Sequence, residues 1–202
     1  FFLAGAPPTQ FAIMLGAVLM GIGFLIVFEP YRMARALSFT NPWADPLGTG
    51  YQLSNALMAF GRGEWFGTGL GHSVQKLSYL PEAHTDFMLA VLGEEFGFVG
   101  ISLVMVLSFG MLACCIKIGH RALKHNFLRA GYLAYGISII FLLQILVNAG
   151  MNMGLMPTKG LTLPFISYGG TSLMMCAAMI SLVLKIDSST QQVNPNREES
   201  NF

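Results

Sequence analysis

The chain has 202 residues, of which 54% are hydrophobic and only 10% are charged, with a formal net charge of +1. This composition is typical of an integral membrane protein, and the near-neutral charge argues against a nucleic-acid partner. The cysteines Cys114, Cys115 and Cys176 lie in apolar runs, which favours buried thiols over a disulfide framework.

Four apolar segments predict an all-α polytopic membrane protein. They are residues 11–28, 87–116, 127–156 and 161–184. The last segment begins in a proline- and glycine-broken stretch, so regular helix is expected only after Gly170. Because the chain begins at Phe1, we expect residues 1–186 to be the C-terminal membrane portion of a longer protein. Residues 187–202 are polar and are expected to form a disordered cytoplasmic tail.

The orientation follows from the distribution of basic residues. The connection 117–129 contains Lys117, Arg121, Lys124 and Arg129 and no acid, whereas the loop 29–86 carries both signs of charge. The positive-inside rule therefore places the connection in the cytoplasm and the long loop on the outer face. Both ends of the chain should then be cytoplasmic, and the loop around Lys159 should lie outside.

The outer loop 29–86 is too long to be a simple connection. Within it, an apolar face with helical spacing is formed by Leu53, Ala56, Leu57 and Phe60. Polar residues on another face are Gln52, Asn55 and Arg62. This pattern predicts a short amphipathic helix on the membrane surface.

Asp86 ends this loop and opens the second span, where the positive end of a helix dipole favours an anion. It forms a polar cluster with His84 and Thr85. Asp86 is either a first-turn helix acid or a general base for a substrate hydroxyl that arrives from the outer leaflet.

Glu94 and Glu95 follow roughly 12–13 Å further along a straight helix. Carboxylates at that depth must be paired, protonated or wet. We expect one of them to pair with a cation or an amide, and a proton path is the alternative. The neighbouring Gly93 and Gly97 predict close helix packing.

The third span carries a polar stripe, because Gln144, Asn148 and Asn152 recur every four residues. Amides that face lipid would have no partner, so the stripe should face other helices or a wet cavity.

Lys159 precedes a glycine turn that leads into the last span. The turn contains Ser167, Tyr168, Gly169 and Gly170. Free N–H groups at a helix start bind anions, and with the lysine they suit a lipid-linked pyrophosphate. A solvated lysine, or one paired with Glu82, is the alternative. No acidic cluster has metal-ligand spacing, so a divalent cation, if one takes part, is expected to arrive with the pyrophosphate.

Three stretches resemble the SEDS family (shape, elongation, division and sporulation) of membrane glycosyltransferases. They are FEPYRMARALSFTNPWADPLGTGYQL, GLGHSVQKLSYLPEAHTDF and MNMGLMPTKGLTLPFISYGGTS. The resemblance covers nearly the whole chain up to about Leu184. The lysine in PTKG favours a member that acts in cell division over one that acts in elongation.

The resemblance implies helices seven to ten of a ten-helix bundle. Such proteins polymerise lipid II into glycan strands on the outer face of the bacterial inner membrane, here at the division septum. Their partners are lipid II, undecaprenyl-pyrophosphate-linked glycan, a class B penicillin-binding transpeptidase and other divisome membrane proteins. The family's essential loop aspartate corresponds to Asp86, and its loop lysine corresponds to Lys159.

The resulting hypothesis is a glycosyltransferase with Asp86 as the catalytic base. The expected substrate-binding residues are Lys159, Arg62, Ser167, Tyr168, Gly169, Gly170, Gln52, Asn55, Asn148 and Asn152. Two alternatives are a lipid II flippase, which also uses broken helices, and a non-catalytic scaffold that recruits the transpeptidase. The apolar inner halves of the spans, at 108–115 and 176–184, favour the enzyme.

Overall fold

The computed structural model describes residues 7–27, 39–75, 80 and 84–192. Its elements are α1 (Pro8–Val27), the short 3-10 helix η2 (Pro42–Ala44), α3 (Tyr51–Gly63), α4 (Met88–Lys124), α5 (Leu128–Asn152) and α6 (Gly170–Gln192). Every regular element in these ranges is helical, which confirms the predicted all-α class.

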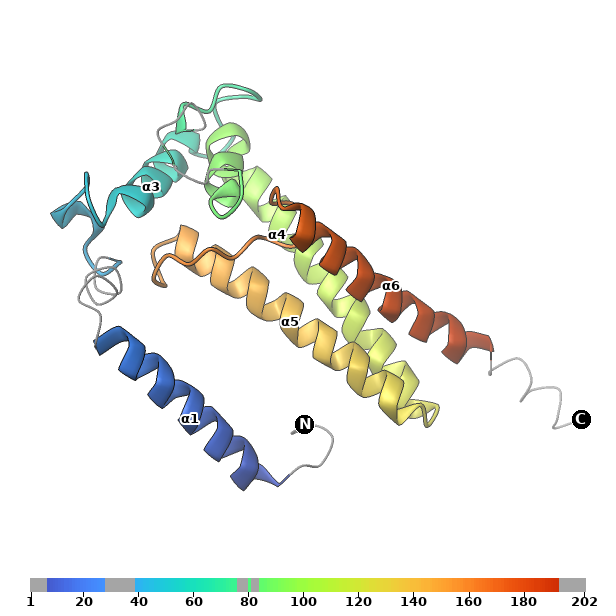
Figure 1. The fold of residues 1–202 in the computed structure, drawn as a ribbon. Helices are drawn as coiled ribbons and strands as arrows, with labels where there is room; N and C mark the ends of the chain where they lie inside the picture. Colours follow the sequence, from blue (N-terminus) through green and yellow to red (C-terminus); the bar gives the residue numbers. More distant parts are fainter. Residues whose placement is uncertain (1–6, 28–38, 76–79, 81–83, 193–202) are drawn as a thin grey trace, which may run out of the picture.

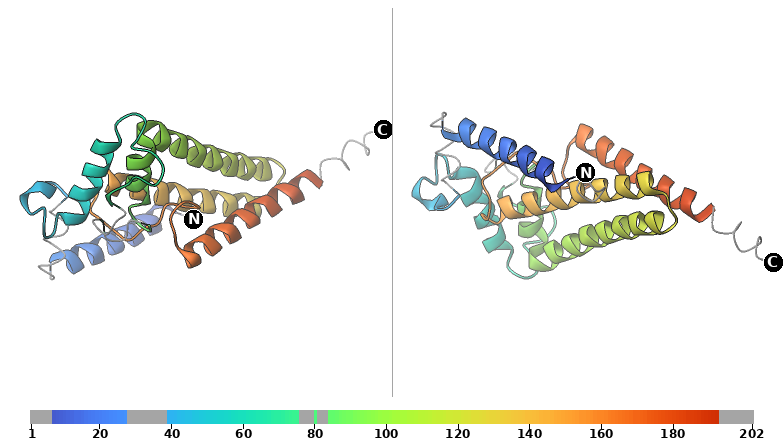
Figure 2. Two further views of the ribbon diagram at one scale, coloured as in Figure 1. Left: turned by 90° about the horizontal axis from the view of Figure 1, so that it is seen from above. Right: turned by 90° about the horizontal axis from the view of Figure 1, so that it is seen from below.

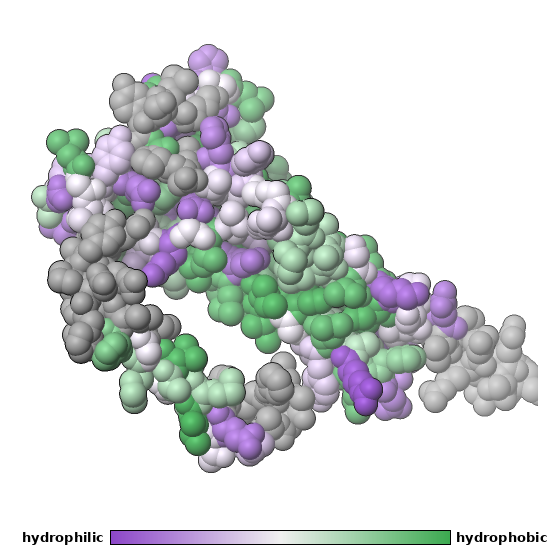
Figure 3. Space-filling model, in the orientation of Figure 1, coloured by the Kyte–Doolittle hydropathy of each residue, from purple (hydrophilic) through white to green (hydrophobic). Residues whose placement is uncertain are grey.

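The body of the fold is a bundle of α4, α5 and α6, which lie side by side in all views (Figure 1, Figure 2). These three helices are long and apolar enough to cross a membrane, as expected for a multi-pass protein. Their shared core includes Leu112, Ile137, Phe141, Cys176 and Val183. Apolar residues cover the length of the bundle, and hydrophilic residues gather toward its two ends (Figure 3).

The predicted spans agree with the helices in position but differ in length. α4 continues to Lys124, beyond the expected end at 116, and α5 ends at Asn152. α6 begins at Gly170, as predicted. α1 corresponds to the expected span 11–28, but only its shorter segment Pro8–Gly21 stands out as an apolar helix. The predicted span at residues 11–28 therefore stays a prediction.

The expectation of a disordered tail was wrong for residues 187–192, because α6 continues to Gln192. Arg121 Nη1 lies 2.7 Å from Asp187 Oδ1, which links the ends of α4 and α6. Thr190 is buried, and its hydroxyl donates to the Ile186 carbonyl. These contacts stabilise the added turns. Residues 193–202 lie outside the described residues.

The amphipathic helix predicted in the outer loop is α3, which packs on the first segment of α4 through a shared apolar cluster. Gly63 of α3 and Gly93 of α4 touch at the crossing, where a Cβ on Gly63 would overlap the Gly93 carbonyl. Gly93 therefore has the packing role that the sequence predicted.

Gly97 has a different role from the expected one, because it breaks α4 with a φ of 67° and a ψ of −163°. The break releases main-chain groups of α4, and loop residues 64–69 replace the lost partners. Four bonds form: Phe98 N to Glu64 O, Val99 N to Trp65 O, Thr68 N to Glu94 O and Gly69 N to Glu95 O. The loop thus supplies hydrogen-bond partners to the helix at the point where the helix is broken.

Substituting Gly97 should be more damaging than substituting another glycine of the same helix. A Cβ at Gly97 would lie 2.5 Å from Gly67 N, and its φ is strained for an L side chain. We expect Gly97→Ala to cost about 1–3 kcal/mol in unfolding free energy. Gly110 has no atom within 4 Å of a built Cβ, so Gly110→Ala should be neutral or stabilising. Unfolding of the two purified variants in SDS measures both effects. Equal losses of stability would contradict the role of Gly97 at the break.

Candidate functional site

The site is organised around the main-chain carbonyl of Asp86, just before α4. Asn148 and Asn152, one turn apart near the end of α5, each donate from Nδ2 to this oxygen at 3.1 Å. The side chain of Asp86 itself is half-buried. The end of α5 therefore fixes the position of the backbone that carries this carboxyl group.

The polar stripe of α5 faces other segments, as predicted, but its two asparagines are not placed to touch a substrate. Asn148 and Asn152 have no exposed surface. Asn148 also donates to the Leu161 carbonyl at 2.5 Å, and Asn152 donates to the Asn148 carbonyl at 2.9 Å. They hold two loops together, which is a positioning role. Gln144 is half-buried, and its Oε1 has no partner among the described residues.

The segment 161–169 runs back along α5 instead of crossing directly to α6 (Figure 1). Three contacts follow this reverse path: Leu161 with Asn148, Leu163 in the cluster of Ile145, and the ring of Phe165 5.9 Å from that of Phe141. Asn148 and Phe141 lie seven residues apart on α5, roughly 10 Å along the helix axis, so the segment returns over about that distance. α6 therefore starts well below the outer end of α5.

Three segments that are far apart in the sequence meet at this end of the bundle. The Asp86 carboxylate lies against Gly160, where a built Cβ would be 3.2 Å from Oδ2. Gly160 directly follows Lys159, which is exposed. The Tyr168 N–H donates to the His84 carbonyl at 2.8 Å. The structure thus brings the Asp86, Lys159 and glycine-turn segments together.

The turn before α6 is held by a hydrogen bond to its serine. Ser167 is buried, and its Oγ accepts a hydrogen bond from Leu163 N at 2.9 Å. Phe165 has a φ of 62°, so the turn is held in a left-handed conformation. Ser167 therefore shapes the turn, whereas the side chain of Tyr168 is 79% exposed.

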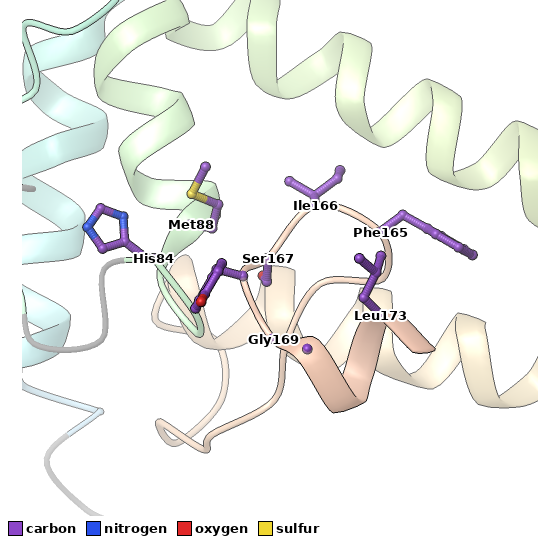
Figure 4. A pocket seen from close by; sticks show the side chains of 9 residues that line it. His84, Met88, Phe165, Ile166, Ser167, Gly169 and Leu173 are labelled. Carbon is purple, nitrogen blue, oxygen red and sulfur yellow. The ribbon is translucent and has the colours of Figure 1, made fainter. Parts of the chain in front are cut away.

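A pocket of about 480 Å³ lies between this turn and the start of α4 (Figure 4). Apolar side chains form most of its wall: Met88, Phe165, Ile166 and Leu173. Polar groups enter from His84, Ser167 and Tyr168, and the pocket reaches Gly169 and Gly170 at the start of α6. The pocket is therefore mainly apolar, with a helix N-terminus at its edge.

Arg62 lies two turns of α4 away from the Asp86 end, where its Nη1 is 3.6 Å from Glu94 Oε1. This confirms the predicted pairing of one deep glutamate with a cation. Glu94 is fully buried and also accepts hydrogen bonds from Ser73 Oγ, Val74 N and Gln75 N. Sequence reasoning missed these loop donors, because only the break at Gly97 brings the loop to the carboxylate.

Of the two predicted amides of α3, Asn55 bonds within its own helix. Asn55 is 6% exposed, and its Nδ2 donates to the Tyr51 carbonyl of its own helix at 2.9 Å. Gln52 is half-buried on the same helix. Within the described ranges, no three or more His, Cys, Asp or Glu residues are grouped to hold a metal ion.

The family model and the most similar relatives all point to one family. The model of the family FTSW_RODA_SPOVE, described as cell cycle protein, matches residues 1–192. A protein of Acinetobacter baylyi named probable peptidoglycan glycosyltransferase FtsW is 93% identical over 202 residues, all of this chain and 51% of the relative. A protein of the same name from Aliivibrio salmonicida is 54% identical over 187 residues, 92% of this chain and 46% of the relative. The chain thus spans about half the length of these relatives.

A solved structure from "Structural coordination of polymerization and crosslinking by a peptidoglycan synthase complex" has a similar fold. Its TM-score to this chain is 0.65 at 27% sequence identity, and the alignment covers 95% of this chain and 52% of that one. The alignment covers nearly the whole chain, so it supports the all-α membrane fold.

Removing one asparagine of the stripe should loosen the site. We expect Asn148→Ala to lower the unfolding free energy by about 1–3 kcal/mol, because it leaves two carbonyls without this donor. The control is Gln144→Ala, one turn earlier on the same stripe, whose Oε1 makes no hydrogen bond in the described structure. Thermal unfolding of both variants is the measurement. A larger loss for Gln144→Ala would show that the stripe does not hold Asp86 as described.

Proposed function

The chain belongs to the FtsW/RodA/SpoVE family of cell cycle proteins, and we propose that it is the catalytic half of a peptidoglycan glycosyltransferase. The proposed reaction extends a glycan strand by transfer to lipid II. The proposed location is the outer face of the bacterial inner membrane at the division septum. The basic connection between α4 and α5 supports this orientation, because it favours a cytoplasmic position.

The observation that carries the proposal is the convergence of Asp86, Gly160 and Tyr168 at one end of the bundle. The acid Asp86 lies against Gly160, the residue next to Lys159, and the turn that leads into α6 lies at the same end of the bundle. Glycosyl transfer from a pyrophosphate needs both a base for the acceptor and donors for the leaving group. The three segments supply these two kinds of group.

In the proposed reaction, Asp86 accepts the proton of the acceptor sugar hydroxyl as that oxygen attacks the anomeric carbon of the donor strand. A new glycosidic C–O bond forms, and the C–O bond to the undecaprenyl pyrophosphate breaks. Lys159 and the N–H groups at Gly169 and Gly170 stabilise the negative charge of the pyrophosphate. A divalent cation, where one takes part, arrives with that pyrophosphate.

The pocket supports a ligand with an anionic head and an apolar chain. Its wall is mostly apolar, and the amide-rich start of α6 lies at one edge. Arg62 is not included in this anion site, because its guanidinium already faces the buried carboxylate of Glu94. Asn148 and Asn152 hold the backbone of Asp86 in place and do not contact substrate.

We also propose a class B penicillin-binding transpeptidase as the partner of the complete protein, together with other divisome membrane proteins. The similar solved structure supports this, because it comes from a complex that coordinates polymerisation with crosslinking. The exposed outer loop residues Trp43, Leu47, Trp65 and Phe66 give this side of the protein an apolar surface.

Removing the proposed base should stop synthesis. In the full-length protein with its transpeptidase partner, Asp86→Asn should slow lipid II polymerisation by about 10²–10⁴-fold while the protein still folds. The matched control is Asp45→Asn, since Asp45 is an exposed aspartate of the same loop whose side chain, among the described residues, bonds to its local turn at Gly48 and Thr49. Near-normal polymerisation by Asp86→Asn would refute the base assignment.

Removing the proposed phosphate contact should affect substrate more than folding. Lys159 is exposed, so Lys159→Ala should change the melting temperature little but weaken lipid II binding by roughly tenfold or more, as for a lost charged hydrogen bond. Lys159→Arg keeps the charge but not the compact ammonium group, and it should keep part of the activity. Both quantities are measured on the same sample. A lower melting temperature with unchanged binding would instead indicate that Lys159 pairs with an acid.

A further inference from the structure

A second pocket lies at the opposite end of the bundle from Asp86, where α4 ends and α5 begins. Its volume is about 710 Å³, within the usual range for ligand sites. The lining side chains include Lys117, His120, Arg121, Lys124, His125 and Tyr135. Five of these six side chains carry or can carry a positive charge.

Four of the basic groups occupy a single face of α4. Lys117, His120, Arg121 and Lys124 are spaced at i, i+3, i+4 and i+7, so they are neighbours on the helix surface, where like charges destabilise each other. The Asp187 carboxylate is 2.7 Å from the Arg121 guanidinium and balances the charge of that residue. The lysines on either side of it still form a concentrated positive surface.

The end of a helix explains only part of this charge. The negative end of the helix dipole favours cations, but its effect falls off within the last turn, which holds Arg121 and Lys124. Lys117 and His120 lie earlier in α4 and still line the same hollow. A bound anion would balance the groups that the dipole and Asp187 do not.

We propose that this pocket binds the headgroup of an anionic phospholipid. The pocket is at the end of membrane-spanning helices, so a lipid headgroup reaches it without leaving the bilayer surface. Ile116 provides an apolar edge toward the span, and Tyr135 has the amphipathic character of an interfacial residue. Lysine side chains extend to phosphates at this level. This site is independent of the glycosyltransferase proposal.

The test is lipid retention by the full-length protein. Protein in detergent is mixed with phosphatidylglycerol or phosphatidylcholine, and retained lipid is counted by native mass spectrometry. The pocket variant is Lys117→Gln with Lys124→Gln. The control is Arg129→Gln with Lys185→Gln, which removes the same charge from exposed residues that do not line the pocket.

We expect the wild type to retain phosphatidylglycerol in preference to phosphatidylcholine. Each basic residue near an anionic headgroup contributes about fivefold to binding, so the pocket variant should bind about 25-fold more weakly. The control variant should retain lipid like the wild type. Equal losses in both variants, or no preference between the lipids, would overturn the proposal. Displacement of the lipid by inorganic phosphate at low millimolar concentration would overturn it in favour of a site for soluble anions.

A second measurement uses the unmodified protein, in case the pocket variant does not fold. Phosphatidylglycerol with a photoreactive headgroup is incorporated with the wild type into nanodiscs and crosslinked. Labelled peptides within residues 116–135 are expected. Labels found only elsewhere in the protein would overturn the proposal.

Discussion

The constraint on which this structure depends is that main-chain groups removed from water need replacement partners. At Gly97 the helix α4 releases donors and acceptors, and the loop 64–69 bonds to them. At the other end of the first α4 segment, the carbonyls of Asp86 and Leu161 receive amide groups of α5. Hydrogen bonds thus fix the loops to the helices at the Gly97 break and at the start of α4.

The same constraint explains why the candidate site can be built largely from loops. Glu94 accepts hydrogen bonds from the backbone of residues 74 and 75, and the glutamate is itself fully buried, so the outer loop is held by a buried carboxyl group. The Asp86 segment is held from below by two asparagines that have no exposed surface. Buried side chains that bond to the backbone therefore fix these two segments.

Local patterns predicted the elements better than they predicted the roles of single residues. Apolar length gave α4 and α5, the spacing of Leu53, Ala56 and Phe60 gave α3, and the glycine pair gave the start of α6. The break at Gly97 was missed because glycine in an apolar run also fits close packing. The backbone donors to Glu94 and the Leu161 carbonyl that binds Asn148 lie in loops, and no local pattern of the sequence encodes the paths of these loops.

The donors to the Asp86 carbonyl come from residues 62 and 66 positions later in the chain. During synthesis, a chain that has emerged only through α4 has the carboxyl group but not the amides that fix its backbone. The site is therefore completed only after α5 has entered the membrane and paired with α4. Any product that stops between these two helices therefore has a membrane anchor and the Asp86 carboxyl group, but not an assembled site.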